Sequence, residues 1–88
     1  MARVKANCEY VQDGDTFRTA GKNWIRLANV RAPDKNEPEF LKAKSILEKL
    51  ILDRPIVYER VTSYNRVVAE VWVGSINVNT YMQERGYA

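Results

Sequence analysis

The chain has 88 residues, with 14 lysines and arginines against 11 acids, so its formal net charge is +3. This length allows one domain with a single hydrophobic core, and no apolar run is long enough to cross a membrane. A single cysteine and the absence of histidine exclude an internal disulfide and any chemistry that needs histidine as base or zinc ligand. A lone cysteine, without a signal-peptide pattern, leads us to expect a cytoplasmic protein with no membrane partner.

The first third of the chain predicts three strands. Residues 3–11 alternate polar and apolar side chains, which is typical of a half-buried strand. On that pattern the inward face holds Val4, Ala6, Cys8 and Tyr10, and Cys8 is a small buried hydrophobe rather than a reactive thiol. A second strand follows at residues 16–19 and a third at residues 24–30. The third strand has two faces, one with Trp24, Arg26, Ala28 and Val30 and the other with Ile25, Leu27 and Asn29.

A helix is predicted after a polar loop that ends near Asn36. Asn36 is expected to cap its N-terminus, with Pro38 in the first turn. Its apolar residues recur at helical spacing, namely Phe40, Ala43, Ile46, Leu47, Leu50 and Ile51. Its basic residues, Lys42, Lys44 and Lys49, are interpreted as the solvated face.

The last third predicts two more strands, at residues 56–61 and 67–73, and then a short helix. Asn79 is expected to cap that helix and Gly86 to end it. Five strands with a helix after the third predict a mainly β, α+β fold. We expect one domain over residues 1–88, a small closed barrel of the oligonucleotide/oligosaccharide-binding (OB) type.

The turn Asp13-Gly14-Asp15 admits two interpretations. Two carboxylates this close repel each other unless a cation or hydrogen-bond donors separate them, so such pairs often hold a hard divalent ion. Asp-Gly is also a common hairpin turn, in which the acids bond only nearby backbone N–H groups. From these residues alone the turn is the simpler interpretation.

Two arginines fall on predicted strands, Arg26 within the third and Arg66 at the start of the fifth. A guanidinium offers planar bidentate donors that suit phosphate, and two of them would neutralise charge in a transition state. For each arginine alone, a salt bridge or a solvated head group is the simpler interpretation. The aromatic candidates for stacking on bases are Trp24, Tyr64, Trp72, Tyr81 and Tyr87, of which Tyr64 stands out because it precedes Arg66.

Four motifs, in order, carry a family resemblance. They read V-x-D-G-D-T from Val11, I-R-L-x-x-V-x-A-P from Ile25, Y-N-R-V-V-A-E-V from Tyr64, and V-N followed after six residues by G-Y-A from Val78. Together they resemble the staphylococcal nuclease (thermonuclease-like) family. The resemblance implies a five-stranded barrel and a calcium-dependent phosphodiesterase that cuts DNA and RNA.

The resemblance also implies roles for single residues. It places Asp15 on a calcium-ligating aspartate, with Asp13 as a neighbouring acid that shapes the metal site. It places Arg26 and Arg66 on the catalytic arginines that hold the scissile phosphate, and Tyr64 on a tyrosine that contacts the nucleotide. Asn79 and Gly86 fall on structural positions near the end of the domain.

Two positions depart from the family pattern. Arg31 stands where the family has a second calcium-ligating aspartate, and Asp34 stands where it has a glutamate that orients or activates the attacking water. A guanidinium in place of a carboxylate changes the local charge by two units, so we expect Arg31 to repel a divalent ion and to pair with Asp15 or Asp34. Asp34 remains a candidate catalytic base, with a reach one methylene shorter.

These observations lead to one main hypothesis and two alternatives. The main hypothesis is a nuclease-family domain that binds nucleotide phosphate or single-stranded nucleic acid, with weak or no cleavage because Arg31 and Asp34 degrade the metal site. Its binding residues are Arg26, Arg31, Tyr64 and Arg66. The first alternative is an active metal-dependent nuclease, for which calcium is the expected cofactor. The second is a non-catalytic protein-interaction module, because fold alone does not fix function.

Overall fold

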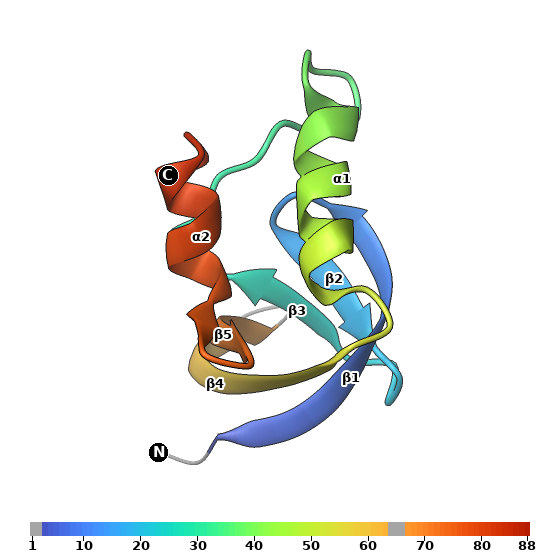
Figure 1. Cartoon of the computed structure of the whole chain (residues 1–88), viewed down its shortest axis with the longest axis vertical. Coiled ribbons are helices and arrows are strands. Elements are labelled where there is room, and N and C mark those ends of the chain that lie inside the picture. Colours follow the sequence, from blue (N-terminus) through green and yellow to red (C-terminus); the bar gives the residue numbers. More distant parts are fainter. Residues whose placement is uncertain (1–2, 64–66) are drawn as a thin grey trace.

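The computed structural model describes residues 3–63 and 67–88 (Figure 1). In chain order the elements are β1 (Val4–Asp13), β2 (Thr16–Thr19), β3 (Trp24–Leu27), α1 (Phe40–Ile51), β4 (Pro55–Ser63), β5 (Val67–Val73), β6 (Ile76–Asn77) and α2 (Val78–Glu84). Within these ranges, no helix is long and apolar enough to cross a membrane.

The strands form a closed barrel. Neighbouring strands follow the order β3-β2-β1-β4-β5-β6, and a parallel pairing of β3 with β5 joins the two sides of the sheet. The other pairings are antiparallel. The predicted five-stranded barrel, with a helix after the third strand and a short C-terminal helix, is therefore confirmed. The two-residue β6 was not predicted and leads directly into α2.

Apolar side chains from the strands and both helices fill the barrel. α1 contributes Ala43, Leu47 and Ile51, all fully buried, and partly buried Ile46 and Leu50 pack beside them. The apolar face predicted for this helix is thus largely confirmed. Figure 1 shows both helices at the same end of the barrel, α1 beside β1 and β2 and α2 beside β5.

A bulge in β1 corrects one prediction. The register with β2 pairs Cys8 with Thr19 and Tyr10 with Arg18, so it shifts by one residue between Cys8 and Tyr10. Such a bulge moves later side chains to the other face of the strand. Cys8 is buried as expected, but Val4 is 43% and Tyr10 is 44% exposed, so the expectation that these two face inward was wrong, and the bulge accounts for Tyr10 alone. Burial raises the pKa of the Cys8 thiol to about 11, which keeps it protonated and unreactive.

The start of α1 also differs from the prediction. The helix begins at Phe40, after Glu39 in the left-handed region with φ of 66°, and no side chain caps it. Asn36 is therefore not the cap. The preceding residues form a separate turn instead, in which the backbone N–H of Glu37 donates to the carbonyl of Asp34 at 2.8 Å.

The third strand ends earlier than predicted. It stops at Leu27, and Asn29 takes the left-handed conformation with φ of 59°, which breaks the alternation of the strand. The sequence placed Arg26, Ala28 and Val30 on one face of a single strand. In the structure Ala28 and Val30 are buried, whereas Arg26 remains partly exposed. The chain after Leu27 leaves the sheet and crosses toward α2.

The cap of α2 lies two residues before the predicted one. Asn77 is the cap, and its side chain accepts a hydrogen bond of 2.8 Å from the backbone N–H of Thr80. Asn79 lies inside the helix and is 2% exposed. Gly86 follows the end of the helix with φ of 99°, as predicted.

The buried Asn79 side chain joins α2 to two other parts of the fold. Its amide nitrogen donates to the carbonyls of Ala28 at 2.9 Å and Ala69 at 3.0 Å. Its oxygen accepts from the backbone N–H of Val71 at 2.9 Å. These bonds hold the segment after β3 against β5, in agreement with the structural position that the family resemblance implied.

Replacing Asn79 by alanine is expected to lower the free energy of unfolding by about 2–4 kcal/mol, because it leaves buried backbone groups of Ala28 and Val71 without partners. Urea denaturation measures this loss. Asn77→Ala is the matched control, since it removes an exposed cap worth about 1 kcal/mol and a half-buried hydrogen bond to Glu70, but leaves no buried backbone group without a partner. Equal losses for the two variants would contradict the role given to Asn79.

Candidate active site

A close packing contact positions the turn between β1 and β2. A Cβ atom on Gly14 would lie 2.7 Å from the Cβ of Ala32 and 2.8 Å from that of Ala43. Glycine is therefore required here because the backbone approaches other chain segments closely. The contact fixes the turn, and with it Asp13 and Asp15, against the segment after β3 and against α1.

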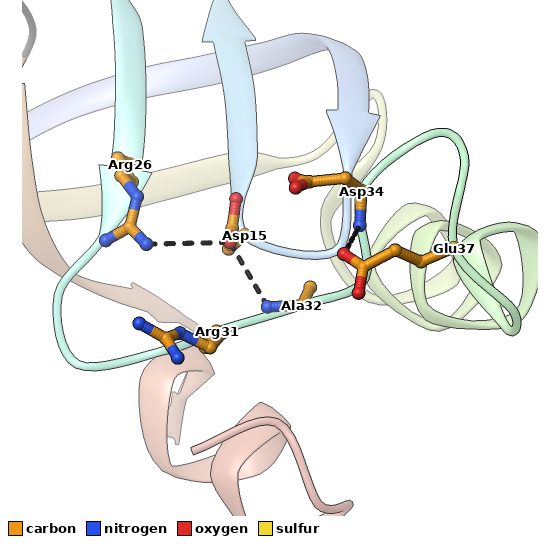
Figure 2. A pocket seen from close by; sticks show the side chains of 6 residues that line it. All are labelled: Asp15, Arg26, Arg31, Ala32, Asp34 and Glu37. Atoms are coloured by element: carbon orange, nitrogen blue, oxygen red, sulfur yellow. Dashed lines mark hydrogen bonds and ion pairs between the residues drawn. The ribbon is translucent and has the colours of Figure 1, made fainter.

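The Asp15 carboxylate lies at the centre of the site and is 9% exposed as a residue. One oxygen, Oδ1, accepts a hydrogen bond from the Thr16 hydroxyl at 2.8 Å. The other, Oδ2, accepts from the backbone N–H of Ala32 at 3.2 Å and lies 3.7 Å from Nη2 of Arg26 (Figure 2). Both oxygens therefore already have partners within the protein.

Asp13 stabilises the turn itself. Its Oδ1 accepts a hydrogen bond of 3.0 Å from the backbone N–H of Asp15, and Gln12 lies 3.4 Å from its other oxygen. Burial, followed by the nearby Asp15 carboxylate, raises the pKa of Asp13 above its ordinary value of 3.8. These contacts are those of a turn residue, which was the simpler interpretation of Asp13 from the sequence.

Arg26 extends from the outward face of β3, and its side chain is 30% exposed. Besides its ion pair with Asp15, Nη2 donates to the carbonyl of Val30 at 3.3 Å, and Nη1 makes a long contact of 3.5 Å with the carbonyl of Leu27. These contacts hold the guanidinium in one orientation while part of it faces solvent. Arg26 thus has the structural salt bridge that the simpler interpretation predicted, and it also lines the pocket described next.

The segment that carries Arg31 and Asp34 is held by its backbone. The N–H of Arg31 donates to the carbonyl of Tyr87 at 2.9 Å, and the Gln83 side chain donates to the carbonyl of Asn29 at 2.9 Å. α2 and the residues after it therefore fix the path of this segment. Arg31 itself is exposed.

The ion pair expected for Arg31 is not formed. Within residues 3–63 and 67–88, Arg31 takes part in no ion pair, and Arg26 pairs with Asp15 instead. Figure 2 shows the Arg31 guanidinium directed toward the Arg26 end of the site, away from Asp34. The physical reason is that Asp15 already accepts the Ala32 N–H and forms its ion pair with Arg26. The Arg31 guanidinium is therefore not its partner.

These residues surround a pocket of about 350 Å³. It is lined by Asp15, Arg26, Arg31, Ala32, Asp34 and Glu37. The two arginines lie at one end, and Asp34 and Glu37 lie at the other (Figure 2). An adjoining hollow of about 420 Å³ is lined by Asn29, Val30 and Ala88 together with the same two arginines. Among its described lining residues none has an acidic side chain, so this end suits an anion.

Sequence reasoning missed Glu37. Its carboxylate accepts a hydrogen bond of 2.8 Å from the backbone N–H of Asp34, which brings it to the pocket. Glu37 stands three residues after Asp34, at a position that the sequence assigned to the first turn of the helix, directly after its expected cap Asn36. The Asp-x-x-Glu spacing of a tight turn was the available signal.

Other predicted residues lie outside this pocket or outside the described chain. Tyr64 and Arg66 fall outside the described residues, so their roles stay predictions. Tyr87 is buried, and Tyr81 is half-buried, with the Arg85 guanidinium 3.4 Å from its ring centre. The two tryptophans do not line the pocket either.

The described side chains do not fit a calcium ion. Calcium takes six to eight oxygen ligands, usually with several carboxylates. Among the residues that the structure describes, no three acidic, histidine or cysteine side chains are grouped so as to hold a metal. Both oxygens of Asp15 already have partners in the protein, and Asp13 accepts a hydrogen bond from the backbone of the turn. Two guanidinium groups at one end of the pocket would also repel a cation.

Comparison with known proteins identifies the lineage. The family model described as staphylococcal nuclease homologue matches residues 24–88. This chain belongs to that family. An uncharacterized endonuclease of Haemophilus influenzae (strain ATCC 51907 / DSM 11121 / KW20 / Rd) is 30% identical over 95 residues, which cover 99% of this chain and 53% of that protein. The chain therefore spans about half the length of this curated relative.

Membership in the staphylococcal nuclease homologue family gives the pocket its context. The family is generally calcium-dependent and acts on nucleic acid. In this member the pocket combines an arginine end with an acidic end, and Asp15 lies between them in contact with Arg26. The arginine end suits a phosphoryl group, and the acidic end suits a water molecule or a hydrogen-bond donor.

Ionisation of Asp13 is expected to destabilise the fold, and Asp13→Asn tests this. Because the folded state raises the pKa of this carboxyl, folded protein binds the proton more tightly than unfolded protein. The wild type therefore loses stability as the pH rises from 3.8 through the raised pKa, and the whole cost is present at pH 7. Asparagine keeps the Oδ1 acceptor without the charge, so the variant is expected to be more stable at neutral pH.

Urea unfolding of both proteins between about pH 3 and pH 7 measures this difference. The advantage of the variant should shrink as the pH falls, because the wild-type carboxyl then becomes neutral too. A difference that stays constant with pH would show that ionisation of Asp13 is not its cause.

Proposed function

We propose that this domain binds single-stranded nucleic acid or a nucleotide phosphate through Arg26 and Arg31, and that it cleaves weakly or not at all. The observation that carries the proposal is that both guanidinium groups line the same hollow, in which no described lining residue has an acidic side chain. Guanidinium groups bind phosphate oxygens with two parallel hydrogen bonds. Arg66 and Tyr64 are expected to add to the same site.

The fixed position of Arg26 supports phosphate binding. Its Nη2 bonds the Val30 carbonyl and faces Asp15, so little side-chain freedom remains to be lost when a ligand arrives. The Asp15 carboxylate compensates part of its charge. Arg31, which is exposed and takes part in no ion pair of the described residues, carries the other positive charge.

Weak cleavage follows from the charges around Asp15. A cation placed about 4 Å from a guanidinium is repelled by roughly 4 kcal/mol at an effective dielectric constant near 20. Arg31 adds such a charge at the position where the family has a carboxylate, and Asp15 already has other partners. Asp34 lines the pocket as the candidate base, but it is shorter than the glutamate of the family pattern.

An active metal-dependent nuclease is the second candidate. Family membership supports it, as does the relative described as an endonuclease. The carboxylates of Asp34 and Glu37 at one end of the pocket also favour it. The two candidates make opposite predictions about calcium, so one set of measurements separates them.

Binding is tested by fluorescence anisotropy of a labelled single-stranded oligonucleotide over a range of salt concentrations. Arg26→Gln and Arg31→Gln are each expected to weaken binding about tenfold and to reduce the slope of log K against log salt by about one. Arg60→Gln is the matched control, because Arg60 is exposed on β4 and lines neither hollow. An equal loss for all three would indicate non-specific attraction, and no binding at all would favour an interaction module.

The charge argument is tested by the double substitution Arg31→Asp with Asp34→Glu. We expect calcium to leave the thermal midpoint of the wild type unchanged and to raise that of the double variant. Calcium at ten times its Kd gives about 1.4 kcal/mol, or a rise of roughly 8 °C for a domain of this size.

Cleavage of an end-labelled oligonucleotide should then appear in the double variant with calcium and disappear with a chelator. The single variants Arg31→Asp and Asp34→Glu serve as controls that separate the charge from the reach of the base. Calcium-dependent cleavage by the wild type at a comparable rate would establish the second candidate instead.

A further inference from the structure

A second group of exposed side chains lies outside the pocket, on the outer wall of β1, β2 and β3. Tyr10 and Trp24 meet edge to face, with ring centroids 6.1 Å apart and an interplanar angle of 87°. The Arg18 guanidinium lies 5.5 Å from the Tyr10 ring centre and 5.4 Å from that of Trp24. We call Tyr10, Arg18 and Trp24 the aromatic platform.

The β-sheet register builds this platform from one residue of each strand. Tyr10 pairs with Arg18, and Arg18 pairs with Trp24, so the three side chains form one row across the sheet. The bulge in β1 is essential, because it turns Tyr10 outward into this row. Tyr10 is 44% exposed and Trp24 is 37% exposed, so both rings offer open surface.

The charges around the platform favour a polyanion. Arg18 and Lys22 both lie beside Glu9, with nitrogen–oxygen distances of 2.9 Å and 2.8 Å, and Lys44 of α1 lies 5.9 Å from the Tyr10 ring centre. Two of these cations therefore share one acid, and Lys44 adds a third positive charge beside the Tyr10 ring. The buried Nε atom of Arg18 has this ion pair with Glu9 but no hydrogen-bond partner among the described residues. Lys44 was interpreted as solvated surface, but it belongs to this group.

The platform is continuous with the pocket. Trp24 lies two residues before Arg26 on β3, so both side chains leave the same outward face about 7 Å apart along the strand. The next row across the sheet pairs Thr16 with Arg26. If one phosphate of a nucleic-acid strand binds at Arg26, the nucleotides next to that phosphate therefore lie within reach of the platform.

We propose that the aromatic platform is a second subsite for single-stranded nucleic acid. Bases stack on the open faces of Trp24 and Tyr10, and Arg18 and Lys44 contact the backbone. Aromatic side chains bordered by basic residues bind single strands in this way, because every base has a face that stacks. The subsite rests on the proposed function, since it lengthens the interface that begins at Arg26.

Two ligands of different length separate the subsite from the pocket. A thymidine 3′,5′-bisphosphate spans only the pocket, whereas a labelled oligothymidylate of about 12 nucleotides covers a typical OB-fold site. Trp24→Ala is expected to weaken binding of the oligonucleotide about tenfold, which is roughly 1.4 kcal/mol, and to change binding of the bisphosphate less than about twofold. Arg26→Gln is expected to weaken binding of both ligands.

The matched control is Trp72→Ala. Trp72 also lies under an arginine, with Arg3 4.2 Å from its ring centre, but it belongs to β5 and borders neither the pocket nor the platform. Its replacement is expected to leave both affinities unchanged. Thermal midpoints of all variants, measured without ligand, show that each protein is folded at the temperature of the binding assay.

A fluorescence measurement provides a second readout, in which the Trp24 side chain is kept. The chain has two tryptophans, so Trp72→Phe leaves Trp24 as the single emitter. The oligonucleotide is expected to quench this emission because a base stacks on the indole, while the bisphosphate does not. If emission instead changes with protein concentration and not with oligonucleotide, the platform is a contact between copies of this chain, and the proposal is overturned.

The outcomes also distinguish this proposal from the proposed function. If wild-type protein binds the oligonucleotide, Arg26→Gln weakens it and Trp24→Ala does not, the subsite is overturned while the function stands. If wild-type protein binds neither ligand, both are overturned. A selective loss for Trp24→Ala, together with quenching of Trp24, supports the subsite.

Discussion

The Asp15 carboxylate is the interaction on which the site depends. It joins three chain segments, because it accepts the hydroxyl of Thr16 at the start of β2 and the N–H of Ala32 after β3, and it faces Arg26 on β3. A buried carboxylate with too few partners would be costly, so these contacts are also what permits its burial. The same contacts occupy the oxygens that a metal ion would require. The contacts that arrange the pocket are therefore also contacts that a metal ion at Asp15 would have to share or replace.

The position of Arg31 follows from how the barrel is closed. The parallel pairing of β3 with β5 ends at Leu27, and the buried amide of Asn79 then holds the carbonyl of Ala28 beside β5. From there the backbone is bound to Tyr87, so Arg31 leaves the segment with its direction already set. Charge alone suggested that Arg31 would pair with Asp15 or Asp34, but the path of the backbone leaves Arg26 as the partner of Asp15.

The sequence predicted the barrel because strand and turn spacing is a strong local signal, and the four motifs agreed with it. The predictions that were wrong concern details that depend on tertiary contacts. The bulge that exposes Tyr10 adds one residue without any mark in the composition, so simple alternation placed that ring in the core. Asn77 and Asn79 are equally good caps by residue type, and only the barrel packing assigns one to the cap and the other to the interior. Such choices depend on tertiary contacts, which no local pattern contains.

Phosphate binding and phosphate cleavage place different demands on this site, and for that reason one can persist without the other. Binding needs donors held in place, and Arg26 is held by contacts that involve no metal ion. Cleavage in this family also needs a cation beside the phosphate, and the positive charge of Arg31 opposes that cation while it attracts the phosphate. On the proposed function, the same charge therefore disfavours catalysis and favours binding of the anion. On the proposal of a second subsite, the outward face of β3, which continues from Arg26 to Trp24, would give a bound strand further surface without any change in the barrel.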